Sequence, residues 1–453
     1  MDIHDAVKYG EKLGADYVEV RYEDILRSNI DLRDGVFHSL ATRRLRGYAV
    51  RVLYHGAWGF SATNVDIRKA VEDATAMSIS SSRAIREPIE LAEIPIIRDR
   101  VKSKMKIKPN EVDYDEKIGH VRRLENLLKS EDYVKSSQIR YEDAHGKKIL
   151  ITSEGTEIEW DVNYILQSVW ITGREGSERG ASRNMIGNVD RGWEIFEEHT
   201  PEELAESMHK KLYNQMHGAK VRRGEFPIVA GPIIVGIIAH EALGHLAEAD
   251  LTINSPFKDM IGKDIAPEYV SMSDRIIDGG FGNNVYDDEG TPIKDVHIIE
   301  NGVLRDIMLN REYAKRWNME PNGHARAEDY GYPPIIRMRN TVFESGDHSF
   351  EELIEDIKFG YYLVDFRGGQ AELNSSFQVG VQEGYVIENG EIGEPIKDTS
   401  ISGIAIEALK NIDAVGKDFG MEYGICGKGQ SAFVSSGGPH LKFKKSITVG
   451  GEK

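Results

Sequence analysis

The spacing of apolar residues alternates between a helical and a strand-like period in the first part of the chain. Residues 3–13 place apolar side chains near every third or fourth position, which predicts a helix. Residues 17–63 alternate apolar and polar positions, with turn signals at Asp34-Gly35 and His55-Gly56, so we predict a meander of about four strands. The helical period returns in residues 66–80. The pattern therefore predicts a helix, a sheet and a second helix.

A similar arrangement follows a long connection. Residues 86–114 hold several prolines and a lysine-rich cluster without sustained periodicity, which is typical of a solvated linker. A helix is predicted at residues 116–129, and β-rich segments at residues 134–174. The hairpin turns of these segments are expected at His145-Gly146 and Glu154-Gly155.

An amphipathic helix is predicted at residues 201–217, where Thr200 and Glu203 form a capping box. We expect an N-terminal α/β region at residues 1–222, whose sub-units at about 1–85 and 113–222 are joined by the basic linker. Residues 223–453 would form the C-terminal domain.

The C-terminal half contains two short hairpin signals, Asn301-Gly302 and Asn389-Gly390, each between apolar strands. Asn-Gly favours the tight turns that join antiparallel strands, because both residues tolerate positive φ. The predicted fold class is α+β. Antiparallel sheet flanked by helices would form the N-terminal region, and a largely antiparallel, barrel-like domain would follow.

Residues 233–250, IIVGIIAHEALGHLAEAD, are apolar on every side apart from two histidines and a few acidic residues. A helix that is apolar all round is normally buried. Ionisable groups inside such a helix are costly unless a metal, a partner or a proton neutralises them. The segment therefore indicates a metal site built on His240, Glu241 and His245.

The spacing of the two histidines requires a distorted helix. In a regular α-helix, five residues rotate a side chain by about 500°, which leaves His240 and His245 roughly 140° apart. A π-bulge would bring both imidazoles onto one face, and Gly244 is a suitable place for it. In the alternative, a regular helix holds Glu241 and His245 as a buried hydrogen-bonded pair at i and i+4.

A catalytic zinc ion usually has three protein ligands and one open position. Cys426, which lies in a glycine-rich tract, and Glu248 compete for the third position. The alternatives to ligation are a small buried hydrophobe for Cys426 and a solvent-facing position at the helix end for Glu248. We favour the solvent-facing position for Glu248.

Charge and cysteine content exclude several classes of protein. The 453 residues carry a formal net charge of −18, which disfavours nucleic acid as a partner. The single cysteine excludes an intrachain disulfide, and the N-terminus lacks the layout of a signal peptide. The longest apolar run is far shorter than the roughly 20 residues that span a bilayer. We expect a cytoplasmic protein without a membrane partner.

Several separated motifs resemble the TldD-type metallopeptidases of the TldD/PmbA family. They are HEALGHLAEAD from His240, GHARAEDYGYPPIIRMRN from Gly323, FRGGQAELNSSFQVGVQEGYVIENG from Phe366, and GICGKGQSAFVSSGGPHL from Gly424. Their order agrees with the family throughout the C-terminal half. The tract after the cysteine, CGKGQ, is slightly shorter than the family form.

The resemblance implies that His240, His245 and Cys426 hold Zn²⁺, with Glu241 beside the bound water as the catalytic base. It implies a peptidase acting on small or unfolded peptides, as a dimer with a PmbA/TldE-like subunit or with itself. The alternatives are a catalytically silent scaffold or regulatory subunit and a non-peptidase zinc hydrolase.

Two groups of residues are candidates for substrate binding. Side-chain donors for the reaction's oxyanion are sought among His324, Arg326 and Arg337, whose alternative role is surface or ion-pair duty. Gly368, Gly369 and Gln370 would offer backbone to an extended peptide, because a strand without bulky side chains admits another chain closely. Tight turns are the alternative for this second group.

Overall fold

The computed structural model describes residues 1–451, and one curved, largely antiparallel sheet organises their N-terminal part. Its strand order is β3-β2-β1-β5-β6-β4, with β7 also paired to β6. The sheet therefore runs through both predicted sub-units, because β1 pairs with β5. The strands are β1 (Tyr17–Arg33), β2 (Val36–Tyr54), β3 (Ala57–Thr63), β4 (Arg98–Val101), β5 (Val134–Thr152), β6 (Glu157–Glu175) and β7 (Glu178–Asn188).

The turns of this sheet follow the sequence signals only in part. Asp34-Gly35 joins β1 to β2 and His55-Gly56 joins β2 to β3, with positive φ at all four residues, so residues 17–63 form three long strands and not four. Gly155 lies in the predicted turn between β5 and β6. His145-Gly146 instead lies inside β5, where an added Cβ on Gly146 would come 2.2 Å from the carbonyl oxygen of Asp24. Close approach of β1, and not a turn, requires that glycine.

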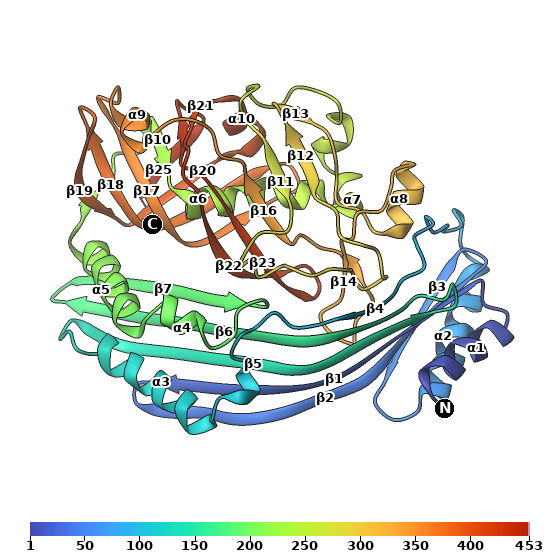
Figure 1. Ribbon diagram of the computed structural model, residues 1–453. Coiled ribbons are helices and arrows are strands. Elements are labelled where there is room, and N and C mark those ends of the chain that lie inside the picture. The colour runs from blue at the N-terminus through green and yellow to red at the C-terminus, as the bar shows by residue number, and fades with distance from the viewer. Residues whose placement is uncertain (452–453) are drawn as a thin grey trace.

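The helices of this part pack beside the sheet. Asp66 caps α2, and Thr200 and Glu203 form the predicted capping box of α5. The helices are α1 (Ile3–Lys12), α2 (Ile67–Ser82), α3 (Tyr114–Leu128), α4 (Ile195–Glu198) and α5 (Pro201–His217). Figure 1 shows the sheet as a long curved layer beneath the C-terminal half, with α1 and α2 at one end and α3 on the outer side.

The C-terminal half contains a ten-stranded sheet and a six-stranded sheet. The larger comprises β8 (Ala219–Lys220), β9 (Gly224–Glu225), β10 (Ile228–Ala230), β17 (Phe359–Ala371), β18 (Ser376–Glu388), β19 (Glu391–Lys397), β20 (Thr399–Ile404), β21 (Ile412–Val415), β24 (Leu441–Phe443) and β25 (Ile447–Gly451). The smaller comprises β11 (Met272–Asp274), β12 (Val296–Glu300), β13 (Val303–Leu304), β16 (Asn340–Phe343), β22 (Gly420–Gly427) and β23 (Ser431–Gly438). A two-stranded ribbon joins β14 (Ala325–Arg326) to β15 (Ile335–Ile336).

Most neighbouring strands in these sheets are antiparallel, and the architecture is α+β as predicted. The predicted hairpins are confirmed: Asn301-Gly302 joins β12 to β13, and Asn389-Gly390 joins β18 to β19. The remaining helices are short, and comprise α6 (Pro232–Ile237), α7 (Ala249–Thr252), α8 (Arg311–Trp317), α9 (Phe350–Ile354) and α10 (Ala405–Lys410). The division of the chain at residue 222 stays a prediction.

The helix that begins with α6 runs through the core of the C-terminal half. Pro232 occupies its first turn, where a missing N–H costs nothing. Its side chains, among them Ile234 and Val235, share one apolar cluster with Leu363 of β17 and Phe343 of β16. This burial confirms the interpretation of residues 233–250 as an internal segment, and it holds the two histidines in a fixed frame.

Candidate metal centre

A π-helical turn follows α6 and aligns the two histidines. Residues Ile238–Gly244 form this π-turn, and the backbone N–H of His245 donates to the carbonyl oxygen of His240, five residues earlier. The wider turn brings the imidazoles together, with ring centroids 5.1 Å apart and ring planes at 78°. The predicted distortion of the helix, ending at Gly244, is confirmed.

Cys426 approaches the histidines from strand β22. It pairs with Ala432 of β23, so the β22–β23 hairpin fixes its height above the π-turn. The Sγ atom of Cys426 lies 3.5 Å from Nε2 of His245, and the ligand atoms of His240, His245 and Cys426 all lie within 4.8 Å of one another. Residues nearly 190 positions apart thus converge at one point.

The chemistry of these three residues fits a divalent ion. Within residues 1–451, Nδ1 of His240 is buried and has no hydrogen-bond partner, which is costly for a polar atom unless another ligand satisfies it. Burial raises the pKa of the Cys426 thiol, but the neighbouring His240 and His245 outweigh burial and lower that pKa from 9.0 to about 5. Two imidazoles and a thiolate match the ligands that zinc takes in catalytic sites.

Glu248 does not face solvent, so that expectation was wrong. Its side chain is fully buried, and Oε2 lies 2.8 Å from Nδ1 of His245. The helix ends before Glu248, whose backbone is extended (φ −75°, ψ 117°), and this turns the carboxylate back toward the histidine. A carboxylate in this place fixes the ring orientation of a metal-binding histidine and leaves Nε2 free for the ion.

Two buried or half-buried cations contact the residues around Cys426 and Glu248, and the sequence did not predict the role of either. Lys428, in the tract that follows Cys426, lies 3.2 Å from Glu248 and 2.7 Å from Asp250. Arg337 is 1% exposed and donates to the carbonyl oxygens of Cys426 at 2.7 Å and Gln430 at 2.5 Å. Both side chains hold the loop of Cys426 in place. The one sequence signal for this role was the CGKGQ tract, which contains Lys428 and the two residues whose carbonyl oxygens Arg337 contacts.

Three family models match the chain in order along its length. They describe PmbA/TldA metallopeptidase domain 1 at residues 18–78, the central domain at residues 107–213 and the C-terminal domain at residues 223–451. The chain belongs to the PmbA/TldD metallopeptidase family. The resemblance of the four separated motifs is thereby confirmed.

Similar proteins of this family match almost end to end. The chain is 36% identical to a zinc metalloprotease TldD homolog of Saccharolobus solfataricus, over 98% of this chain and 99% of the relative. It is 35% identical to a metalloprotease of Methanocaldococcus jannaschii, over 93% and 95% of the two chains. The crystal structure of TldE from Thermococcus kodakarensis has the same fold, with a TM-score of 0.79, 19% identity and 99% coverage of both chains.

The catalytic candidate Glu241 lies next to His240 on the π-turn and is partly exposed. It therefore combines a position beside His240 with access to solvent. Within residues 1–451, no helix is both long and apolar enough to cross a bilayer.

The three side-chain candidates for substrate binding each have partners within the protein. His324 is fully buried between Asn322 and Asp274, at 2.9 and 3.1 Å. Arg326 donates to the carbonyl oxygen of Met338 at 2.5 Å and also lines a cavity. Arg337 braces Cys426. None of the three is an ordinary surface residue, and their role toward substrate stays a prediction.

The glycine-rich candidates lie on β17, and not in a tight turn. Gly368, Gly369 and Gln370 pair with β18 on one side, whereas β10 pairs only with residues 361–363 on the other. An added Cβ on Gly369 would come 3.1 Å from Ile237, the last residue of α6. This stretch therefore runs past the helix three residues before His240, and its use by a peptide stays a prediction.

Proposed function

We propose that this chain is a zinc-dependent peptidase in which His240, His245 and Cys426 hold the ion and Glu241 is the general base. The observation that carries the proposal is the convergence of the π-turn and β22, which places three ligand atoms within 4.8 Å. Membership in a metallopeptidase family and the unpartnered Nδ1 of His240 support it.

Each residue has a distinct task in this proposal. Bound zinc supplies Lewis acidity and lowers the pKa of water toward neutrality. Glu241 accepts a proton from the attacking water and returns it to the leaving amine, a role worth typically 10²- to 10⁴-fold in rate. Glu248 orients His245, and Arg337 holds the backbone of Cys426 through its carbonyl oxygen.

The proposed substrates are small or unfolded peptides that bind in extended form. The unpaired side of β17 at Gly368, Gly369 and Gln370 would offer backbone hydrogen bonds that tolerate many sequences. The likeness in fold to a TldE protein supports a second proposal, a dimer with a PmbA/TldE-like subunit or with a second copy of this chain. We also keep the cytoplasmic location as a prediction.

Metal content of the purified full-length protein is the primary test. We expect about one zinc per wild-type chain, retention in the control His55→Ala, whose side chain is 70% exposed, and loss in His245→Ala and Cys426→Ser. Zinc retained in Cys426→Ser would contradict the ligand set.

Activity is then measured on casein and short peptides with Glu241→Gln beside the wild type. We expect Glu241→Gln to retain zinc and to lose at least 10²-fold in cleavage rate. A wild type that binds zinc and cleaves no peptide, alone or with a TldE-like partner, would favour a scaffold. Cleavage of other bonds only would favour a different zinc hydrolase.

A further inference from the structure

A cavity of about 330 Å³ lies between the N-terminal sheet and the hairpin that carries Cys426. Residues of β1, β5 and β6 form one wall, and the opposite wall includes Ile425 and residues 431–433 of the β22–β23 hairpin. Successive side chains of a strand point to opposite faces. Ile425 therefore lines the cavity, while its neighbour Cys426 faces the histidines. The cavity is separated from the metal centre by the thickness of one strand.

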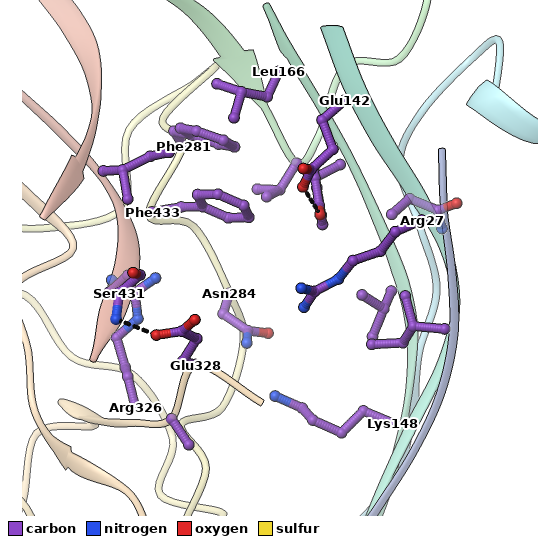
Figure 2. A pocket seen from close by; sticks show the side chains of 18 of the residues that line it. Arg27, Glu142, Lys148, Leu166, Phe281, Asn284, Arg326, Glu328, Ser431 and Phe433 are labelled. Atoms are coloured by element: carbon purple, nitrogen blue, oxygen red, sulfur yellow. Dashed lines mark hydrogen bonds between the residues drawn. The ribbon is translucent and has the colours of Figure 1, made fainter. Parts of the chain in front are cut away.

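One side of the cavity is flat and apolar. Phe281 and Phe433 stack with ring centroids 4.2 Å apart and planes at 14°, and the edge of Tyr164 meets Phe433 at 4.7 Å. Leu166 continues this surface toward β6 (Figure 2). Aromatic faces of this kind accept another ring or a long aliphatic side chain, with a gain beyond simple area burial.

A cation without a partner faces the apolar side. Figure 2 shows the guanidinium group of Arg27 extending from β1 into the space, and within residues 1–451 its buried Nε has no hydrogen-bond partner. A guanidinium group that reaches into a cavity without a partner can bind an anion through charge-assisted hydrogen bonds. Arg27 therefore points to a ligand with a planar anionic group.

The carboxylates of the cavity are already engaged. Glu142 accepts a hydrogen bond from the hydroxyl of Tyr164, and Glu328 accepts one from the backbone N–H of Ser431 at 2.5 Å. The other two cations of the wall are also engaged: Lys148 pairs with Asp288 at 2.5 Å, and Arg326 donates to the carbonyl oxygen of Met338 at 2.5 Å. Arg27 is thus the cation of the wall without a hydrogen bond or salt bridge within residues 1–451, and the one left to bind an anion.

The cavity leads into a second space of about 160 Å³. The two spaces share Lys148, Val162 and Asn284, and the second reaches Lys102 and Lys104 of the connection before α3. A ligand held at Arg27 can therefore extend away from it as a chain. This shape suits the end of a peptide better than an isolated small molecule.

We propose that this cavity binds the carboxy-terminal residue of a peptide, with its carboxylate on Arg27 and a large apolar side chain against Phe433. As an account of substrate anchoring, it rests on the proposed peptidase function. Binding itself needs no metal, because Arg27 and Phe433 are not ligands of the metal centre. A peptide end held here would favour chains that finish in an aromatic or long aliphatic residue.

Calorimetric titration of the full-length protein tests the proposal with N-acetyl-phenylalanine and its carboxamide. We expect the acid to bind both the zinc-loaded and the zinc-free protein, at least tenfold more tightly than the amide. Arg27→Gln should abolish this preference, and the control Arg43→Gln, an exposed arginine of β2, should retain it. Leu166→Trp, which fills the cavity from β6, should weaken both ligands at least tenfold.

Each contrary result has a distinct meaning. Binding of the acid only to the zinc-loaded protein would place the carboxylate on the metal and overturn the proposal. Equal binding of acid and amide, or no binding of either, would also overturn it. Binding that survives Arg27→Gln and Leu166→Trp would place the ligand elsewhere. Zinc-independent binding by a protein that cleaves no peptide would leave the cavity assigned and refute only the peptidase function.

Discussion

The Oε2 atom of Glu248 lies 2.8 Å from Nδ1 of His245, on the side of the ring away from Cys426. The carboxylate also accepts the backbone N–H of Met338 at 3.2 Å, so it is held from a second direction. Because both partners are fixed in the core, Glu248 sets the rotation of the imidazole before any ligand binds. The proposed metal centre therefore depends on a carboxylate that need not touch the metal.

Glu248→Gln tests this orienting role. Glutamine keeps the size of the side chain but replaces a charged acceptor with a neutral amide, so we expect zinc affinity to fall by about 10- to 100-fold. Competition with a chromophoric chelator measures the change. The control Glu206→Gln, on the exposed side of α5, should leave the affinity unaltered. Equal affinities of wild type and Glu248→Gln would show that His245 is oriented by other contacts.

Gly244→Ala tests the π-turn. An added Cβ at Gly244 would lie 2.3 Å from Sδ of the buried Met338 and 3.0 Å from the carbonyl oxygen of Ala239. Overpacking of this kind typically costs about 1 to 3 kcal/mol. We expect the free energy of unfolding to fall by that amount in chemical denaturation, together with weaker zinc retention.

Gly119→Ala is the matched control for that substitution. Gly119 lies inside the regular helix α3, where an added Cβ meets nothing within 4 Å. Alanine should raise the free energy of unfolding there by roughly 0.5 to 1 kcal/mol, since glycine is a poor helix former. If both substitutions stabilise the protein, the π-turn tolerates a side chain at Gly244 and the steric argument fails.

The sequence predicted the π-turn because the spacing of His240 and His245 is incompatible with a regular helix carrying both on one face. It did not predict Glu248, because a helix continued past His245 would turn that side chain outward, whereas the backbone becomes extended at Glu248. From residues alone, Cys426 and Glu248 competed for the third ligand position, with a solvent-facing position favoured for Glu248, and the family resemblance then favoured Cys426.

Two errors in the predicted N-terminal sheet come from contacts with strand β1. Residues 17–63 were predicted to form about four strands, yet they form three, because β1 pairs with residues 36–53 of β2 in one ladder. Gly146 has the composition of a turn and the environment of a crowded strand, because the carbonyl oxygen of Asp24 approaches it. Pairing with β1 decides both cases, and single-sequence patterns do not report it.

Acid should weaken the contact between the N-terminal sheet and the C-terminal half through Asp288. Burial raises the pKa of this aspartate, but Lys148 of β5 and Arg21 of β1 outweigh burial and lower the pKa from 3.8 to about 2. A lowered pKa in the folded state stabilises the protein above pH 3.8, and this stabilisation is lost as the pH falls toward 2. The shift corresponds to about 2 kcal/mol at pH 7.

Asp288→Asn should therefore lower the free energy of unfolding at pH 7 and 5 by about that amount, and by roughly half as much at pH 3. Urea denaturation of the zinc-free protein at each pH measures the difference, so that loss of metal in acid does not contribute. The exposed Asp259→Asn serves as the control. A difference between Asp288→Asn and the wild type that stays constant from pH 7 to pH 3 would contradict the assigned pKa.

Arg337→Met tests whether the loop of Cys426 is held by its carbonyl oxygens. Arg337 is buried and donates to the carbonyls of Cys426 and Gln430, which lie on either side of the turn between β22 and β23. Methionine preserves much of the volume and removes both donors. The carbonyl oxygen of Gln430 keeps the backbone N–H of Lys428 at 3.0 Å, whereas the loss of a buried hydrogen bond typically costs about 1 to 3 kcal/mol. We expect the free energy of unfolding to fall by about 1 to 3 kcal/mol, and zinc to dissociate faster because the thiolate is no longer fixed. The exposed Arg43→Met should change the free energy of unfolding by less than about 0.5 kcal/mol. A destabilised Arg337→Met that releases zinc at the wild-type rate would show that the arginine stabilises the fold without positioning the ligand.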